Sequence, residues 1–580
     1  AQRPGNNGRL DDAALLDRMF TSKSGPKIRA LWAGDISGYI SHSEADQALC
    51  NYLAFWTDRD PAAIDRLFRG SGLYRPDKWG DRSDYRDRTI GAAIAATSEG
   101  YHPSPAARGD FIPETLTPRE AETWGETGDA RLLAQEYRGR LVYDHAAGQW
   151  LAWAGHWWEP DRCGAAVKHV SNDIAALYLT EAATARKADD QKTSDALQKR
   201  ARQLRDRRRC ENVLFLAARP YLGIVGDEWD RDPWALGCVN GVLDLKTGTL
   251  RPGRPADYIQ AHCPTEWAGL DAPAPTWEQC ISDVLGGDLE LIAFTQRLLG
   301  YAVAGLTTEH IFPILWGDGR NGKSTILETL KSVLGDTLAM RTEADALMIT
   351  GRDVAGDAPK PYLFAMRGKR LCWASESREG RRLDVNLIKT LAGGDTMNVR
   401  TLHGRPVSWE PTHTLFLLTN NRPQISPDDR AIWDRVLLIP FTQRFVDDPG
   451  PGELQRDPDI KQKLLSEASG ILAWLVRGCL EWQRGGLRPP QTVKTQTEEY
   501  RREEDTVQQF LDDRCVTTGP GAAVCTTRAG ELYAAYKQWG QSSGLEVISS
   551  TAFGRRLGKL GYTKDKKPTG LVYQGIGLLP

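Results

Sequence analysis

The sequence lacks the features that assign a chain to a membrane, fibrous or strongly charged class. Apolar stretches such as 414–419 and 436–441 are far shorter than the ~18–20 residues that cross a bilayer, so no membrane span or membrane partner is expected. Lys and Arg total 74 against 76 Asp and Glu, a net charge of -2, and the bulk charge therefore indicates no nucleic-acid partner. Any phosphate binding must come from local basic patches.

Cysteine spacing and the first residues exclude two further classes. The 10 Cys contain no C-x-x-C pair and have no His at finger-like distance, which favours reduced thiols in a cytosolic protein over a metal finger or a disulfide framework. The chain begins Ala-Gln-Arg-Pro, without an apolar segment or a cleavage pattern. We therefore expect no secretory signal and a processed or truncated product.

Length and patterning indicate a multidomain α/β chain. The 580 residues are several times the ~100–200 residues of a usual domain. Apolar residues recur at helical spacing over 10–100, a Trp-rich β-like pattern covers about 130–165, and a helical stretch covers 165–222. The predicted domains are a helical segment at 1–110, an α+β accessory domain at 125–270, a nucleotide-binding core at 277–445, a helical lid and linker at 446–495, and a winged-helix-like domain at 500–580.

Basic residues cluster in two places outside the core. The run 199–209 holds seven of them and is either a solvated helix face or a DNA contact; both interpretations stay open. The tail from about 500 combines short helices, a strand expected near 571–573 and a basic stretch, an order that predicts a winged-helix module. Its candidate DNA-binding residues are Arg555, Arg556 and Lys559.

A phosphate-binding loop is the most specific motif. The apolar run 311–316 leads into Gly317, Asp318, Gly319, Arg320, Asn321, Gly322, Lys323 and Ser324, which match G-x-x-x-x-G-K-[ST], and Thr325 continues as a helix. Small residues let backbone N–H groups surround a β-phosphate, and the helix N-terminus adds its dipole. Lys323 would reach the β and γ oxygens of ATP, and the Ser324 hydroxyl would ligate Mg²⁺.

Three later segments supply candidate catalytic groups. Glu376 follows the apolar strand expected at 370–375 and would activate the attacking water, directly or through Mg²⁺. Asn420 ends the strand expected at 413–419 and would sense the γ-phosphate. Arg430 and Arg435 precede a fourth strand, and either could reach a neighbouring subunit's nucleotide as a finger.

A hairpin is expected between the acid and the sensor, over 397–409. Arg400 lies on its first strand, and His403 and Arg405 lie at its tip. A basic tip projecting from an ATPase core suits a phosphate backbone that runs through a pore. The alternative is an ordinary surface hairpin.

The order of these motifs resembles the superfamily 3 helicases, a branch of the AAA+ ATPases, and within it the phage and plasmid primase-helicases related to poxvirus replication helicases. The resemblance rests on 317–325, 374–376, Lys389 with 393–395, 419–423 and 431–441. It implies a homo-hexameric ring that translocates 3′ to 5′ on single-stranded or forked DNA in a bacterial cytoplasm, with ATP and Mg²⁺ as cofactors. It assigns Lys323 and Ser324 to phosphate and Mg²⁺, Glu376 to the catalytic acid, Asn420 to the sensor, Arg435 to the finger, and His403 and Arg405 to DNA.

Two departures qualify the resemblance. Ser375 stands where many members of the family have a second acidic residue. No segment before residue 10 is large enough for a primase-polymerase, so we expect a primase or polymerase to be a separate partner or part of a longer parent protein. A second hypothesis, a nucleotide-regulated replication initiator or loader with little unwinding, fits the basic segments as well.

Overall fold

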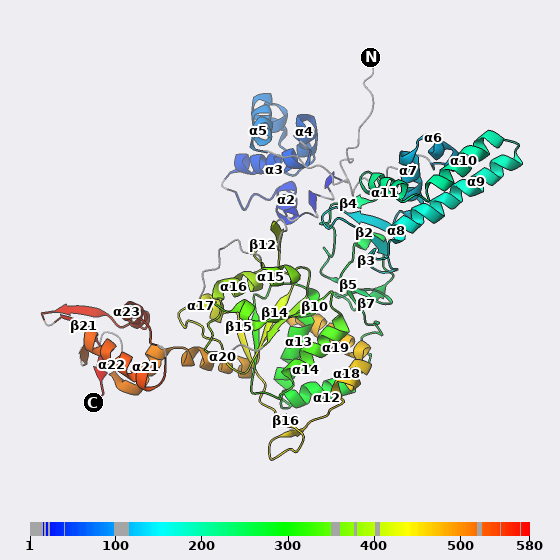
Figure 1. The fold of residues 1–580 in the computed structure, drawn as a ribbon. Coiled ribbons are helices and arrows are strands. Elements are labelled where there is room, and N and C mark those ends of the chain that lie inside the picture. Colours follow the sequence, from blue (N-terminus) through cyan, green and yellow to red (C-terminus); the bar gives the residue numbers. More distant parts are fainter. Residues whose placement is uncertain are drawn as a thin grey trace. The chain divides into compact units, whose positions relative to one another are not determined.

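The computed structural model describes residues 15–16, 19–20, 22, 24–39, 41–57, 59–97, 115–349, 360–375, 380–400, 406–518, 525–545, 547–568 and 570–579. The chain forms two compact units, 1–136 with 170–225 and 137–169 with 226–580 (Figure 1). Both helices and sheets are present, which confirms a multidomain α/β chain. The division falls inside the predicted accessory domain, and the five-domain scheme stays a prediction. No helix in the described part is long and apolar enough to cross a bilayer.

The first unit begins with helices α2 (Gly25–Trp32), α3 (His42–Trp56), α4 (Pro61–Arg69) and α5 (Ser83–Ala96), with a π-helix at Pro76–Gly80. Ser41 and Asp60 cap α3 and α4 by accepting hydrogen bonds from backbone N–H groups, which is why these helices begin where they do. The apolar faces of the helices close over Phe68 and Trp79, whose rings stack at 3.7 Å. The helical spacing in the sequence therefore corresponds to a packed helical core.

The rest of the first unit is also helical. It contains α6 (Pro118–Thr123), most of α7 (Glu126–Tyr137), α9 (Ala175–Lys187), α10 (Gln191–Gln203), α11 (Arg207–Ala218) and the short strand β4 (Gly223–Ile224). The expectation of a β pattern from about residue 130 is wrong at its start, because α7 occupies that stretch. Thr117 and Glu120 form a capping box that starts α6 just before it.

Two small sheets open the second unit, one an antiparallel meander and the other mixed. Strands β1 (Leu141–Asp144), β2 (Gln149–Trp153) and β3 (Trp158–Pro160) form a meander, followed by α8 (Ala165–Lys168) and a π-helix at His169–Ile174 that runs into the first unit. Strands β5 (Ala235–Cys238), β6 (Gly241–Asp244), β7 (Thr249–Arg251) and β8 (His262–Cys263) form a sheet in the order β7-β6-β5-β8, with a 3-10 helix at Pro255–Asp257. This sheet is mixed, since β5 pairs with β8 in parallel. The strand–turn–strand expected at 240–248 is found in part: the range holds β6 and the turn after it, and the second strand, β7, begins one residue later, at Thr249.

A five-stranded parallel sheet forms the centre of the second unit, in the order β10-β11-β14-β9-β15. Its strands are β9 (Phe312–Trp316), β10 (Ala339–Glu343), β11 (Leu371–Ser375), β14 (Thr414–Thr419) and β15 (Val436–Pro440). Alternate residues face opposite sides: Phe416 packs in one buried cluster, and Leu415 and Leu417 pack in the other. Burial on both faces explains why each strand is a continuous apolar run.

Helices cover both faces of this sheet, as Figure 1 shows. Helices α12 (Pro275–Val284), α13 (Leu289–Ala304), α14 (Lys323–Leu334), α18 (Ile460–Ser466) and α19 (Ala468–Gly485) contribute to one cluster, and α15 (Pro361–Ala365), α16 (Val385–Gly393) and α17 (Arg430–Trp433) contribute to the other. A 3-10 helix spans Ala344–Leu347, and two-stranded pairs join β12 (Met397–Arg400) to β13 (Pro406–Trp409) and β16 (Phe445–Val446) to β17 (Leu454–Gln455).

Helix α20 (Gln491–Glu503) crosses the predicted boundary between the linker and the winged-helix-like domain. The backbone N–H of Leu438 on the edge strand β15 donates to Thr497 Oγ1 at 3.0 Å, and Tyr500 is buried in a core cluster of the parallel sheet. The helix thus covers an edge that would otherwise expose unpaired backbone groups.

The C-terminal module follows α20 and has its own core around Phe510, Tyr536 and Phe553. It comprises α21 (Thr506–Arg514), α22 (Ala529–Ser542) and α23 (Ser550–Lys559) with strands β18 (Cys515–Thr517), β19 (Thr526–Arg528), β20 (Lys564–Lys567), β21 (Gly570–Gln574) and β22 (Ile576–Leu578). The strand expected near 571–573 lies within β21, which pairs with β20 as an antiparallel hairpin.

Candidate nucleotide site

The predicted phosphate loop lies between β9 and α14, at the carboxyl edge of the parallel sheet. Gly317 has φ +152°, and a Cβ there would overlap the carbonyl oxygen of Phe441. Gly322 has φ +85°, and a Cβ there would lie 2.5 Å from Val284 Cγ1. Both positions therefore require glycine, for backbone conformation and for space.

The loop presents a series of unused backbone donors. The N–H groups of 318–325 donate no hydrogen bond to any described residue, whereas Gly317 N–H donates to Thr419 O and Ile326 N–H donates to Gly322 O. Successive free N–H groups that lead into a helix N-terminus form a concavity that favours an anion. The donor set fits the phosphates of a nucleotide.

Lys323 begins α14 and is buried, with 6% of its surface exposed. Its Nζ donates to the carbonyl oxygens of Gly317 and Asp318, the latter at 3.3 Å, and to Asn420 Oδ1 at 3.2 Å. Burial lowers the pKa of Lys323 to about 8. A cation held by uncharged oxygens is incompletely compensated, so an anion beside it would be stabilised.

Asn420 follows β14, the strand that lies next to β9 in the sheet. Because the two strands are parallel and Thr419 pairs with Trp316, the residues after both strands meet at one edge. Trp316 Nε1 donates to the carbonyl oxygen of Asn420 at 3.1 Å. The structure thus brings Asn420 to Lys323, as a sensor would require.

The remaining loop residues divide by exposure. Asn321 is buried and donates to Phe441 O at 3.2 Å, and Arg320 takes a left-handed φ of +63°. Asp318, Gly319 and Ser324 are exposed, and Thr325 is half-buried. Ser324 stands in the first turn of α14, where its hydroxyl could serve a metal ion.

The acid end of the site is only partly described. Glu376 lies outside the described residues. Ser375 ends β11, two strands from β9, and its buried Oγ has no hydrogen-bond partner among the described residues. The described residues contain no group of three or more His, Cys, Asp or Glu that could hold a metal ion. The metal assignment to Ser324 and Glu376 stays a prediction.

Arg435 lies at the amino end of the parallel strands, whereas the loop lies at their carboxyl end. It immediately precedes β15, which runs parallel to β9, so it is separated from the loop by the length of the strand, roughly 15 Å. Its Nη1 donates to Ala431 O at 2.6 Å. Arg430 is 85% exposed and pairs with Asp434 at 3.7 Å. Neither guanidinium adjoins the loop of its own chain.

The predicted DNA-contacting hairpin is described only at its base. β12 pairs with β13 in antiparallel register. His403 and Arg405 lie outside the described residues, as does the side chain of Arg400. Their DNA contacts stay predictions.

The C-terminal basic residues differ from one another. Arg555 is exposed, and no ion pair to another described residue involves it. Arg556 is 16% exposed and pairs with both Asp505 and Asp428, and Lys559 lies 3.3 Å from Asp428. A DNA contact by Arg556 would have to replace two carboxylates that already hold it.

The basic residues of the run 199–209 also differ from one another in burial and in their ion pairs. Arg200 lies 3.4 Å from the buried carboxylate of Asp129, and Arg209 lies 3.5 Å from the same group. Burial raises the pKa of Asp129 to about 6. Arg202, Arg205 and Arg208 are exposed and form no ion pair with a described residue. The run therefore has a structural side and a solvent-facing side.

Sequence reasoning missed the partners that support the site. Arg422 lies over the rings of Trp316 and Tyr500, at 4.7 Å and 5.2 Å, and pairs with Glu503. Lys389 Nζ lies 2.7 Å from Asp429. Both Arg422 and Lys389 belong to segments that carry the family resemblance, 419–423 and Lys389 with 393–395, but that signal does not indicate which residues they contact.

Family models match two parts of the chain. Residues 130–286 match the model described as D5 N terminal like, and residues 42–103 match the NrS-1 polymerase HBD domain. A solved structure of the NrS-1 C terminal region aligns over 78% of this chain and 100% of that chain, at 11% identity and a TM-score of 0.40.

Curated relatives come from large DNA viruses. Putative helicase L207/L206 of Acanthamoeba polyphaga mimivirus is 27% identical over 330 residues, which cover 54% of this chain and 34% of the relative. Putative helicase 022R of Frog virus 3 is 24% identical, covering 54% and 39% respectively, and putative primase C962R of African swine fever virus is 22% identical, covering 53% and 33%. The chain thus spans a third to two-fifths of the length of these relatives. The resemblance to the primase-helicase group that the sequence motifs predicted is confirmed.

Proposed function

We propose that this chain is an ATP-dependent replicative DNA helicase that acts as a homo-hexameric ring and translocates 3′ to 5′ on single-stranded DNA. The observation that supports this most is the convergence of Lys323, Asn420 and the N–H groups of 318–325, which donate to no described residue, at the carboxyl end of the parallel sheet. Relatives named putative helicase or primase support a role in DNA replication. We place the protein in a phage, prophage or plasmid replication system in the bacterial cytoplasm, with a primase or polymerase as partner.

The loop's residues would divide the work of holding a nucleotide. The N–H groups of 318–325 would donate to phosphate oxygens, and Lys323 would turn its Nζ from the loop carbonyls toward them. Mg²⁺, held by Ser324 and Glu376, would supply neutralisation of phosphate charge. Asn420 would orient the attacking water, and Glu376 would accept a proton from it.

Arg435 fits a finger that acts across a subunit boundary. Its position at the sheet edge opposite Lys323 supports contact with a neighbouring copy's nucleotide rather than its own. A heterologous, head-to-tail interface that closes into a ring would supply that contact to every subunit. Hydrolysis would then be tied to the ring and to DNA in its channel, where His403 and Arg405 would contact the phosphate backbone.

The first test measures nucleotide binding and strand displacement. Lys323→Ala should weaken binding of a fluorescent ATP analogue about ten- to hundredfold, because charged hydrogen bonds are lost. Lys331→Ala is the matched control, since Lys331 lies on the same helix and pairs only with Asp336 among the described residues. ATP hydrolysis without unwinding of forks of either polarity would reject the helicase proposal.

Glu376→Gln separates a motor from a nucleotide-regulated initiator or loader. In a motor, the variant should bind DNA and ATP and stall, because proton acceptance is lost. A loader that uses nucleotide only for assembly would keep its function. The readouts are DNA-stimulated phosphate release and particle size with ATP and single-stranded DNA.

A further inference from the structure

One segment connects the proposed sensor to the proposed finger. Residues that follow the sheet in the chain contact this segment at several positions between 423 and 428. This sensor-to-finger segment runs from Asn420 to Arg435. Tyr500 of α20 donates to the carbonyl of Pro423, and Glu504 accepts from the N–H of Ile425 at 3.0 Å. Arg501 donates to Pro427 O at 3.5 Å. These hydrogen bonds reach positions 423, 425 and 427, so the segment is held at several points and not by a single contact.

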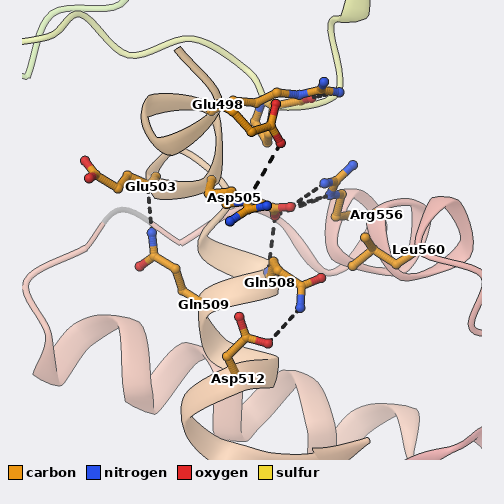
Figure 2. A pocket seen from close by; sticks show the side chains of 11 residues that line it. Glu498, Glu503, Asp505, Gln508, Gln509, Asp512, Arg556 and Leu560 are labelled. Atoms are coloured by element: carbon orange, nitrogen blue, oxygen red, sulfur yellow. Dashed lines mark hydrogen bonds and ion pairs between the residues drawn. The ribbon is translucent and has the colours of Figure 1, made fainter. Parts of the chain in front are cut away.

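The last contact in this series comes from the C-terminal module. Arg556 of α23 donates to Asp428 Oδ1 through Nη1 and to Asp505 through Nη2 and Nε, the Nε contacts measuring 3.2 and 3.3 Å. Figure 2 shows Arg556 reaching Asp505 at the start of α21. Both carboxylates are largely covered, at 28% and 7% exposure. A guanidinium held by two covered carboxylates fixes their relative position more firmly than a surface pair does.

The surroundings of Arg556 do not favour nucleic acid. A cavity of about 830 Å³ adjoins it and is lined by carboxylates as well as guanidiniums (Figure 2). The charged lining residues are Glu498, Glu503, Asp505, Asp512, Arg501, Arg502 and Arg556. Phosphate backbones require an excess of positive charge, which this lining lacks.

Asp428 is well placed to transmit this restraint. The next residue, Asp429, pairs with Lys389 of α16 and caps α17 by accepting from Ile432 N–H. Arg435 lies two residues after the end of α17 and donates back to Ala431 O within that helix. Fixing Asp428 therefore fixes the start of the short helix that precedes the proposed finger.

We propose that Arg556 is a positioning residue for ATP turnover: through Asp428 it holds the sensor-to-finger segment, and it makes hydrolysis responsive to the C-terminal module. The proposal rests on the proposed ATPase function and deepens it. It also reassigns Arg556 from DNA binding to control of the finger, and leaves Arg555 as the DNA candidate on the same helix.

The test compares Arg556→Gln with two matched variants. Arg556→Gln should lower the kcat of DNA-stimulated ATP hydrolysis about ten- to hundredfold with KM for ATP little changed, because small displacements of a catalytic group have effects of this size. Arg556→Lys should restore part of the loss. Arg502→Gln, on an exposed residue paired only with Glu498 among the described residues, should change nothing. Arg555→Gln should instead raise the DNA concentration needed for half-stimulation.

Hydrogen exchange gives a readout independent of activity. Arg556→Gln should speed amide exchange in a peptide covering 426–436 while exchange in α22 stays unchanged. If Arg556→Gln unfolds the module, Asp428→Asn replaces it, since it leaves the Asp505 pair intact. Unchanged exchange and kcat, or a defect only in DNA half-stimulation, would overturn the proposal. A wild-type protein without ATPase activity would overturn the proposed function. The exchange experiment would still decide whether Arg556 restrains the sensor-to-finger segment.

Discussion

The Nζ of Lys323 lies 3.2 Å from Oδ1 of Asn420, although 97 positions separate the two residues in the chain. The sheet order places β14, which ends one residue before Asn420, beside β9, which leads to the loop. The side-chain amide of Asn420 therefore lies beside the ammonium of Lys323, where the proposed nucleotide would place its γ-phosphate. We therefore predict that Lys323 contributes mainly to nucleotide binding and Asn420 mainly to turnover.

Asn420→Ala should reduce turnover far more than binding. Loss of one preorganised polar group at a reacting centre costs about 10²–10³ in kcat, whereas the N–H groups and Lys323 would still hold the nucleotide. Single-turnover phosphate release and analogue binding measure the two quantities. Asn421→Ala, which removes the same amide from the next position, is the control. Equal losses in binding and turnover would contradict a sensing role.

Nucleotide binding should depend on pH through Lys323. Its pKa is lowered to about 8 by burial, and a bound anion would raise it by favouring the charged form. Below pH 8 the ammonium is already present, so affinity should be flat. Above pH 8 binding must take up a proton, and affinity should fall by up to about tenfold per pH unit.

Calorimetry in two buffers of different ionisation enthalpy measures this proton. Uptake should be found near pH 8.5 and not at pH 6.5. Lys323→Arg keeps its charge over the whole range and should lose the pH dependence. Proton release in place of uptake would show that another group controls binding.

Gly322 and Gly319 should respond differently to alanine. At Gly322 a Cβ meets Val284 and the backbone has φ +85°, so Gly322→Ala should lower the free energy of unfolding by about 1–3 kcal/mol. At Gly319 nothing lies within 4 Å of an added Cβ, and Gly319→Ala should leave stability unchanged. Denaturant titration without nucleotide measures both. Equal effects would mean that the loop adopts another conformation in solution.

The sequence predicts the local parts of the site better than its long-range pairs. The loop glycines, the helix at Lys323 and the apolar strands follow from motif and periodicity, because they depend on neighbours in the chain. The contact between Lys323 and Asn420 depends on strand order, which periodicity does not encode. Likewise, the basic stretch at Arg556 shows the sign of the charge but not its partner Asp428, 128 positions away.

Arg370 should be essential for the stability of the second unit. Its guanidinium is buried and donates to the carbonyls of Pro233, Ala235 and Val303 at 3.0, 2.7 and 2.8 Å. Arg370→Met leaves these acceptors unsatisfied and should cost about 3 kcal/mol or more. Arg367→Met, at an exposed position nearby, should stay within about 0.5 kcal/mol of wild type. Thermal unfolding followed by Trp fluorescence distinguishes them.

Mixing two inactive variants tests whether Arg435 acts between subunits. Arg435→Ala keeps an intact loop, and Lys323→Ala keeps an intact finger, so each alone should hydrolyse little ATP. In an equal mixture, about a quarter of head-to-tail interfaces would combine an intact loop with an intact finger, and activity should return to that level. Arg430→Ala should be active alone, because its guanidinium is exposed and pairs within its own helix turn with Asp434. A mixture that stays inactive, with both variants still assembling into the same particle, would show that Arg435 does not act across the boundary, since each ring would contain every group that the mechanism needs.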